Sequence, residues 1–214
     1  MLQKQQQPQT TPTVAQEIEI KIKTSSENMK KIEAWLANNA TFEGTEHHKE
    51  VYLDNPKSTF FFMHPNGEKD ALKYLRVRFS NNGGSICFKN WYQDPKTGKT
   101  THCDEYETKV SDPDVMLKLF EQLGYTDQTR MEKTRKKFSV DDYEIVIDDV
   151  MSLGIFVEIE LKKQADNPIE ACKELETFLV KKMGVTEYWI QNRGYVSRLR
   201  NPDIEFGEYK TSKK

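Results

Sequence analysis

Short segments in which apolar and charged residues alternate recur along most of the chain. The first is Glu17-Ile18-Glu19-Ile20-Lys21-Ile22-Lys23, in which isoleucines alternate with charged residues. A period of two places alternate side chains on opposite faces of a β-strand, so this segment predicts a strand with one apolar and one charged face. For a single strand, such a pattern usually indicates a sheet whose charged face is solvated.

The same character appears in further segments, which argues against solvated faces throughout. They span 74–79, 85–89, 105–109, 133–137, 143–148 and 157–162. Three segments read Glu-x-Glu-x-Lys, beginning at Glu17, Glu105 and Glu158. Repetition of one charged face over so many strands indicates that these faces share a common environment.

Helices are expected after the three Glu-x-Glu-x-Lys strands, over 26–39, 112–123 and 168–183. Apolar residues recur there at helical spacing, and Asp112 and Asn167 each precede a proline, a common helix start. The helices need the apolar strand faces to rest on, so the charged faces must point the other way. About eight such strands can close into a barrel whose charged faces line a central cavity.

A cavity of that kind would hold carboxylates beside lysine and arginine side chains, a costly mixture unless the charges pair or bind ions. The basic positions are Lys21, Lys23, Arg76, Arg78, Lys89, Lys133 and Arg135. The acidic positions are Glu17, Glu19, Glu105, Glu107, Asp148, Glu158 and Glu160. The basic set suits a polyphosphate, and all-oxygen ligands suit Mg²⁺ or Mn²⁺ better than zinc. Together they indicate metal-assisted phosphoryl chemistry.

Composition narrows the class of protein further. The 214 residues include 32 Lys+Arg and 34 Asp+Glu, and this net charge of −2 argues against a generic nucleic-acid or membrane-surface binder. Three cysteines without a Cys-x-x-Cys pair fit a reducing compartment, and no apolar run reaches the length of a membrane span. We therefore expect a cytoplasmic protein with one folded domain between polar tails at 1–15 and 201–214.

Ordered motifs extend over residues 16–200. They are Glu17-x-Glu19-x-Lys21, His48-Lys-Glu-Val-Tyr-Leu-Asp54, Leu75-Arg-Val-Arg78, Phe88-Lys89, Glu105-x-Glu107, Glu132-Lys-x-Arg135, Ile147-Asp148, Phe156-Val-Glu158-x-Glu160 and Arg193-Gly-Tyr195. In this order they resemble the CYTH superfamily, the triphosphate tunnel metalloenzymes. The segments 48–54 and 123–138 make the chain most similar to the class IV adenylate cyclase branch.

The resemblance implies an α+β fold over 16–200: a closed antiparallel eight-stranded β-barrel, the triphosphate tunnel, with helices packed on the outside. It implies that divalent metal, Mg²⁺ or Mn²⁺, is held by Glu17, Glu19, Glu158 and Glu160, with Asp148 nearby. It implies that the triphosphate is bound by Lys21, Lys23, Arg76, Arg78, Lys89, Lys133, Arg135 and Arg193. Within that set, catalytic roles fall to Lys21, Arg76, Lys133 and Arg135. Glu105 and Glu107 are either a second acidic position or partners of tunnel lysines.

The expected activity is that of a divalent-metal-dependent enzyme acting on a small-molecule triphosphate, ATP or another, similar to class IV adenylate cyclases that form cyclic AMP and pyrophosphate. The alternatives are a hydrolase of inorganic, thiamine or nucleoside triphosphate, and a non-catalytic polyphosphate or nucleotide sensor. No nucleic acid or membrane partner is expected, and a homodimer is left open. The stretch from Gly194 to Leu199 departs from the family's late motif, so its role is left open.

Several other residues are expected to have ordinary roles. The histidines, which share no metal spacing, are expected at the surface: His47, His48, His64 and His102. Cys87 falls on a lumen-facing position without a base at fixed spacing, so a nucleophilic role is not expected. The tryptophans are expected in core or interface packing: Trp35, Trp91 and Trp189.

Overall fold

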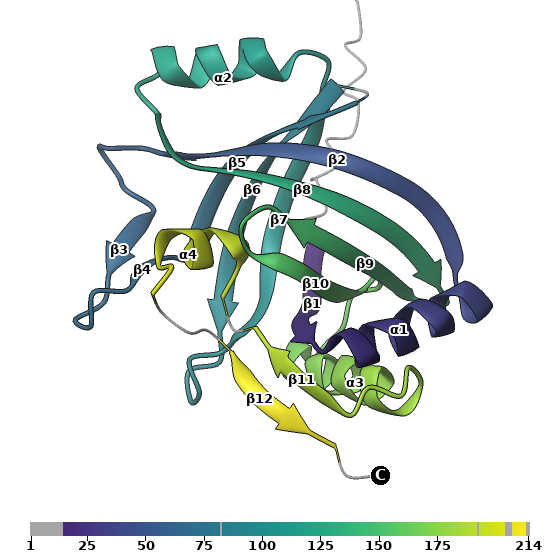
Figure 1. Cartoon of the computed structure of the whole chain (residues 1–214). Helices are drawn as coiled ribbons and strands as arrows, with labels where there is room; N and C mark the ends of the chain where they lie inside the picture. Colours follow the sequence, from purple (N-terminus) through teal and green to yellow (C-terminus); the bar gives the residue numbers. More distant parts are fainter. Residues whose placement is uncertain (1–14, 82, 192, 204–206, 213–214) are drawn as a thin grey trace, which may run out of the picture.

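The computed structural model describes residues 15–81, 83–191, 193–203 and 207–212 of the chain (Figure 1). Its barrel strands are β1 (Ala15–Thr24), β2 (Thr41–Asp54), β5 (Lys73–Ser80), β6 (Gly83–Gln93), β7 (Thr100–Val110), β8 (Thr126–Val140), β9 (Tyr143–Val150) and β10 (Gly154–Leu161). They pair antiparallel in the order β1-β10-β9-β8-β2-β5-β6-β7, and β7 pairs back onto β1. The expected closed antiparallel barrel of eight strands is confirmed.

The remaining elements in the described ranges are α1 (Ser26–Asn39), β3 (Phe61–Met63), β4 (Lys69–Ala71), α2 (Pro113–Gln122), α3 (Pro168–Lys181), β11 (Glu187–Ile190), α4 (Tyr195–Arg200) and β12 (Glu208–Thr211). Figure 1 shows α1 and α3 together near one end of the barrel and α2 over the other. β11 extends the sheet beyond β1, and β12 pairs with β11. Part of the expected C-terminal tail is therefore a strand. Among the described residues, we find no helix with the length and apolar character needed to cross a membrane.

The three long helices begin and end close to the positions expected from the sequence. Ser25 caps α1, and Asp112 and Asn167 cap α2 and α3 through hydrogen bonds to the third backbone N–H that follows. Each cap satisfies a donor that a helix start otherwise leaves unpaired, which typically stabilises it by about 1 kcal/mol. Each helix also follows directly on a Glu-x-Glu-x-Lys strand.

The apolar strand faces point outward, as expected. Ile18, Ile20 and Ile22 are almost fully buried in the cluster that α1 and α3 form against the barrel. Burying one such aliphatic side chain is worth about 1.5–3 kcal/mol. Because alternate residues of a strand face opposite sides, Glu19 and Lys21 must point into the barrel.

One end of the lumen is apolar, which the sequence analysis did not predict. We call the residues there the plug cluster: Tyr52, Met131, Val150, Phe156, Tyr195 and Val196. Its strand residues lie two positions from charged residues such as Lys133 and Glu158, so they face the lumen. α4 provides the last two members and packs on β4 and β8 (Figure 1). The lumen is therefore charged in its middle and closed by apolar contacts at this end.

Candidate active site in the barrel

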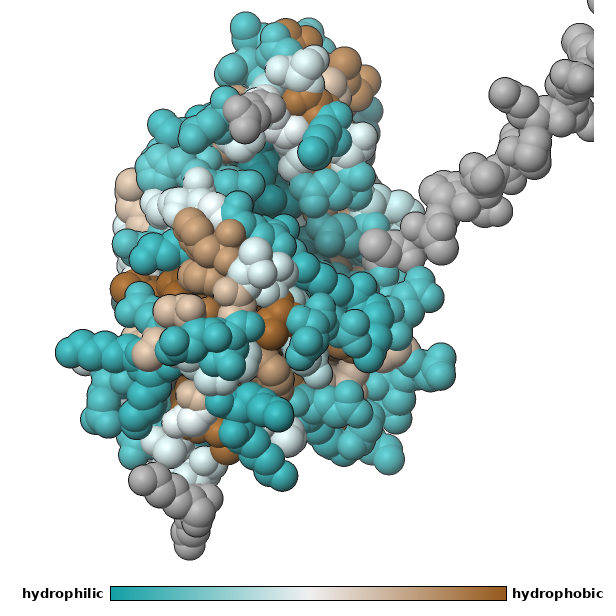
Figure 2. Space-filling view, turned by 90° about the vertical axis from the view of Figure 1, so that its right-hand side faces the viewer, coloured by the Kyte–Doolittle hydropathy of each residue, from teal (hydrophilic) through white to brown (hydrophobic). Residues whose placement is uncertain are grey.

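A cavity of about 340 Å³ lies inside the barrel and is lined mainly by charged side chains. On the face shown in Figure 2, hydrophilic residues border a recess. Six of the predicted basic residues line the cavity: Lys21, Arg76, Arg78, Lys89, Lys133 and Arg135. Four of the predicted acidic metal ligands line it as well: Glu17, Glu19, Glu158 and Glu160. Ten of the predicted site residues, which come from separate strands with alternating apolar and charged positions, therefore line one cavity.

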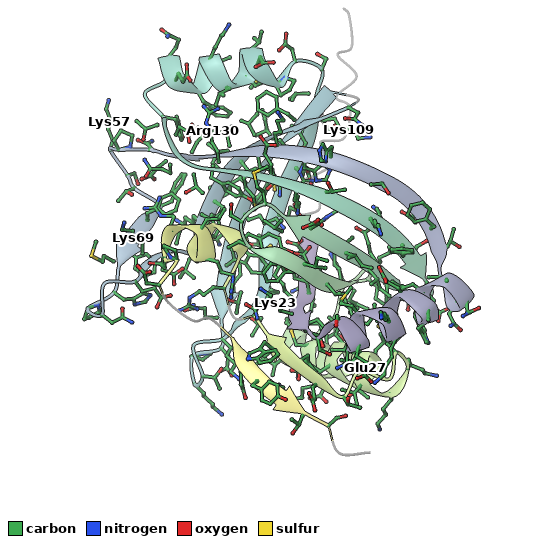
Figure 3. The ribbon with its side chains drawn as sticks, viewed as in Figure 1. Lys23, Glu27, Lys57, Lys69, Lys109 and Arg130 are labelled. Atoms are coloured by element: carbon green, nitrogen blue, oxygen red, sulfur yellow. The ribbon has the colours of Figure 1, made fainter. Side chains whose placement is uncertain are left out.

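Two predicted basic residues do not line this cavity. Lys23, labelled in Figure 3, lies where β1 pairs with β11, and its Nζ donates to the carbonyl oxygen of Leu153 over 3.0 Å. Arg193 lies outside the charged lumen, with its Nε 3.0 Å from Glu68 Oε1 and 3.2 Å from Asp70 Oδ2. Both cations are held by other partners in this structure.

Asp148 is also absent from the cavity wall, because it is fully buried behind it. Its carboxylate accepts hydrogen bonds from Lys133 Nζ at 2.9 Å, Arg135 Nε at 2.7 Å and the Tyr195 hydroxyl at 3.2 Å. Burial alone would raise the pKa of Asp148, but the Arg135 and Lys133 cations lower it. In this structure Asp148 orients two of the predicted catalytic cations.

Glu50, which the sequence analysis did not select, holds the other half of the basic wall. Its buried carboxylate accepts hydrogen bonds from Arg78 Nε at 2.8 Å and from the Tyr52 hydroxyl at 2.7 Å, and Arg76 Nη1 lies 3.5 Å away. Burial opposes ionisation, yet Arg76 and Arg78 hold the pKa of Glu50 well below its usual range. Glu50 lies in the motif at 48–54, two positions from Tyr52 on the same strand. The spacing that places both side chains on one face was the available signal.

Glu105 and Glu107 pair with basic residues of the wall. Glu105 lies 3.7 Å from Lys89 Nζ, and Glu107 lies 3.5 Å from Arg76 Nη2. Of the two roles that the sequence left open, internal pairing is the one observed. Cys87 lines the same cavity as a buried thiol, and burial raises its pKa to about 12, so it is not a thiolate at neutral pH.

The remaining acidic residues face one another across the seam between β1 and β10. Glu19 stands opposite Glu160, and Lys21 stands opposite Glu158. Lys21 Nζ lies 3.2 Å from Glu19 and 2.9 Å from Glu158, while Glu17 pairs with Lys89. Lys21 and Lys89, the cations beside these carboxylates, are thus each paired with at least one of them.

Two carboxyls of this group carry raised pKa values. Burial, with the charges of Glu17 and Glu19, raises the pKa of Glu160 to about 8. Burial also raises the pKa of Glu19, with Glu158 and Glu17 adding to it and Lys21 opposing it. Burial and the neighbouring carboxylates thus disfavour ionisation of Glu19 and Glu160, a bound cation would favour it, and an all-oxygen donor set of this kind fits a hard divalent cation.

The predicted metal set does not converge in this structure. Among the described residues, two groups bring ligand atoms within 4.8 Å of one another: His64, Glu68 and Asp70, and Cys87, Glu105 and Glu107. Basic side chains lie in contact with both groups. The charges of Glu17 and Glu19 raise the pKa of Glu160, and the charge of Glu17 also raises that of Glu19, so these carboxyls interact electrostatically without forming a common ligand position.

A second cavity, of about 310 Å³, adjoins the first. Its wall includes residues of β11, α3, β12 and the hairpin between β6 and β7. Five residues line both cavities: Glu19, Lys21, Tyr74, Trp91 and Gly194. Trp91 was expected to pack in a core or an interface, but it lies at this junction, with Lys89 Nζ 5.6 Å from its ring centroid. The junction thus has an aromatic side and a charged side.

Comparison with known proteins gives consistent results over the whole barrel. The family model for the CYTH domain matches residues 15–185. A Methanocaldococcus jannaschii protein named "Putative adenylate cyclase" is 24% identical over 181 residues, which are 84% of this chain and 96% of the relative. The PH1819 protein from Pyrococcus horikoshii superposes with a TM-score of 0.66 at 25% identity, covering 87% of this chain and 99% of the other.

A structure from Hippeastrum, described as a putative adenylyl cyclase that reveals a dominant triphosphatase activity, superposes with a TM-score of 0.60 at 15% identity. The match covers 89% of this chain and 97% of the other. The family model spans all eight barrel strands and every charged residue that lines the lumen. The chain belongs to the CYTH domain family.

Proposed function

We propose that this protein is a divalent-metal-dependent enzyme that acts on a nucleoside triphosphate in the barrel, converting ATP to cyclic AMP and pyrophosphate. The observation that carries the proposal is a wall of seven lysine and arginine side chains beside a group of carboxyls, two of which have raised pKa values, in a cavity that shares Tyr74 and Trp91 with a second one. Family membership supports an enzyme acting on a triphosphate, and the finer reaction is our inference.

The chain's own residues provide the phosphate-binding surface. Arg76 and Arg78 offer guanidinium groups from β5, and Lys133 and Arg135 approach from β8. Glu50 and Asp148 fix these groups from behind, so the cations need little reorganisation to meet an anion. Preorganised cations of this kind stabilise the charge that develops on phosphate oxygens in the transition state.

Glu17, Glu19, Glu158 and Glu160 would hold the divalent cation, since their side chains border the same cavity, and a bound cation would favour ionisation of Glu19 and Glu160, whose pKa values are raised without it. A bound Mg²⁺ or Mn²⁺ would polarise phosphate oxygens and favour ionisation of the attacking hydroxyl. Lys21 lies between Glu19 and Glu158, where it would orient both carboxylates and contact the anion. Asp148 would act on this reaction by positioning Lys133 and Arg135.

The second cavity favours a substrate with an organic part over inorganic triphosphate. Tyr74 and Trp91 stand at its junction with the lumen, and aromatic rings are common stacking surfaces for bases. Inorganic triphosphate has no aromatic or apolar part that could stack on these two rings. The alternative reaction is hydrolysis of the triphosphate by water in the same lumen, and the description of the Hippeastrum structure supports testing it in parallel.

Product analysis decides between these reactions. Purified protein is incubated with ATP and, separately, with inorganic triphosphate, in Mg²⁺, Mn²⁺ or EDTA, and the products are separated by chromatography. We expect cyclic AMP and pyrophosphate from ATP and no turnover in EDTA. Release of phosphate from either substrate, without cyclic AMP, would establish the hydrolase instead. Absence of any turnover would contradict an enzymatic role.

Substitution of Arg76 tests whether the cationic wall binds the substrate. Losing a charge-assisted phosphate contact costs about 2 kcal/mol of transition-state stabilisation, so Arg76→Ala should lower kcat/KM about 30-fold or more. Arg130→Ala is the matched control, because Arg130 lies on the outer face of β8 and pairs with Asp127 (Figure 3). Unchanged kinetics in a folded Arg76→Ala protein would remove the wall from the reaction.

A further inference from the structure

His48 is buried in the lumen wall, although it was expected at the surface. Its side chain is 2% exposed and belongs to the lining of the barrel cavity. It lies on β2, directly opposite Lys133 of β8 in the antiparallel register. His47, the next residue along the strand, is exposed, so the two histidines face opposite sides of the barrel.

The contacts of His48 define which of its nitrogens carries hydrogen. Nε2 lies 2.6 Å from Glu46 Oε2, and an ionised carboxylate can only accept a hydrogen bond. Nε2 is therefore the protonated nitrogen of the neutral ring, and Nδ1 presents a lone pair. Nδ1 is buried without a hydrogen-bond partner among the described residues. A buried acceptor without a partner is rare in proteins and calls for a functional explanation.

The charges around His48 explain why this nitrogen stays unprotonated. Burial, followed by the charge of Arg78, lowers the pKa of His48 to about 4, and Lys133 adds to the effect. Glu46 and Glu50 oppose the shift. The neighbouring strands β5 and β8 contribute further cations to this part of the lumen: Arg76, Arg135 and Lys137. His48 is therefore a base that is kept neutral by its burial and by the cations of the proposed substrate site.

A polyphosphate bound to those cations would remove the part of the pKa lowering that Arg78 and Lys133 cause, while the part caused by burial would remain. Its negative charges would offset Arg78 and Lys133, and the ring would then lie between an anion and the Glu46 carboxylate, both of which favour an imidazolium. The proton would come from the buffer, forming the Nδ1–H bond, and would be released again when the anion leaves.

We propose that His48 is a proton-linked residue of the anion site, which takes up one proton at Nδ1 when a polyphosphate occupies the lumen between Arg78 and Lys133. The inference rests on the proposed function, because it requires the lumen to bind polyphosphate. It adds that polyphosphate affinity rises as the pH falls through the range in which His48 of the complex titrates, whereas phosphate binding by lysine and arginine alone would not show this dependence.

Calorimetry tests the proposal with inorganic triphosphate in EDTA, where neither turnover nor metal binding contributes. Titrations at pH 5.5 in two buffers of different ionisation enthalpy give the number of protons taken up. We expect wild-type protein to take up at least about half a proton more per site than His48→Gln, since the free ring is almost wholly neutral at this pH. His47→Gln, the matched control from the outer face, should behave like wild type.

The outcomes separate this inference from the proposed function. Binding of inorganic triphosphate with equal proton uptake in wild type and His48→Gln would overturn the role of His48 and leave the anion site standing. No binding to wild type would overturn the inference about His48, whereas the proposed function would be overturned only by the absence of turnover of ATP with Mg²⁺ or Mn²⁺. If His48→Gln fails to fold or to bind, NMR of the wild-type imidazoles decides. The titration midpoint of His48 should then rise by at least about 1.5 pH units with inorganic triphosphate, roughly a thirtyfold gain in proton affinity and the rise that half a proton at pH 5.5 requires. An unchanged midpoint would refute the proposal.

Discussion

Glu160 retains its proton at a pH where an exposed glutamate has lost it. Burial, with the charges of Glu17, Glu19 and Glu144, raises its pKa from an ordinary 4.5 to about 8. Between these two pH values the folded protein holds a proton that the unfolded chain has released. The free energy of unfolding therefore falls as the pH rises through this window, by up to about 1.4 kcal/mol per pH unit.

Replacing this carboxyl should remove that pH dependence. We expect Glu160→Gln to be more stable than wild type at pH 8.5, by more than about 1 kcal/mol, and almost equally stable near pH 4, where the Glu160 carboxyl is largely protonated in the folded and the unfolded protein alike. Urea unfolding in EDTA at the two pH values measures the difference. Glu27→Gln is the control, because Glu27 lies exposed on α1 and pairs with Lys31 (Figure 3). Parallel curves for wild type and Glu160→Gln would show that the Glu160 carboxyl titrates as a solvated group.

The limits of sequence reasoning at the residue scale follow from what alternation encodes. Alternation fixes which face a side chain occupies, and it placed Arg76 and Arg78 correctly. It does not encode how deep a side chain lies in the barrel, so it could not show that Asp148 is buried behind the cavity wall. It also could not show that β1 pairs with β11 instead of β10 at the position of Lys23. Nor could it show that His48 is buried, because only the neighbouring strands supply its surroundings.

At the scale of elements, the plug cluster joins α4 to the barrel. Phe156 has no exposed surface, and its ring centroid lies 5.1 Å from that of Tyr195. Truncating a buried phenylalanine usually costs 3–5 kcal/mol, so Phe156→Ala should lower the free energy of unfolding by about that amount. Ile155→Ala, on the exposed opposite face of β10, should change it by less than about 1 kcal/mol. Denaturant unfolding of both variants checks the difference, and equal effects would mean that α4 is not anchored through Phe156.

The elements that the sequence predicted are those with local signals. The capping residues Asp112 and Asn167 predict the starts of α2 and α3, and strict alternation of apolar and charged residues predicts β1. By contrast, β12 carries no strong pattern of its own and depends on partners far away in the chain, such as Glu176, which pairs with Lys210. α4 likewise follows from packing against the plug cluster. Contacts between residues so far apart in the sequence form only in the closed barrel, and a local sequence pattern carries no information about them.

For the molecule as a whole, the lumen charges should make stability depend on ligand. Carboxylates and cations already neutralise one another in many pairs, yet burial and nearby carboxylates near β1 disfavour ionisation of Glu19 and Glu160. Magnesium with a slowly hydrolysed triphosphate analogue would offset both sets of charges and bridge several strands. Binding to the folded state stabilises it by about 2.7 kcal/mol at a hundred times the Kd. We therefore expect Tm to rise by several degrees, since about 1 kcal/mol shifts a protein of this size by 2–4 °C.

Monophosphate with magnesium is the comparison, because it reaches few of the cations and should raise Tm much less. Differential scanning fluorimetry at equal ligand concentrations measures both shifts. Equal shifts from the two anions, or no shift from either, would contradict a lumen that binds the triphosphate along several strands.

The pairing of β1 with β10 has a consequence for how the site comes into being. Glu19 and Glu160 belong to the first and last strands of the barrel, and they become neighbours only when the ring of strands closes. No earlier portion of the growing chain contains both halves of the carboxylate group, and contacts so distant in sequence form slowly because a long loop must be ordered first. The carboxyls that we propose as metal ligands therefore come together only when the barrel is finished, so a nascent chain lacks the proposed metal site until the end of folding.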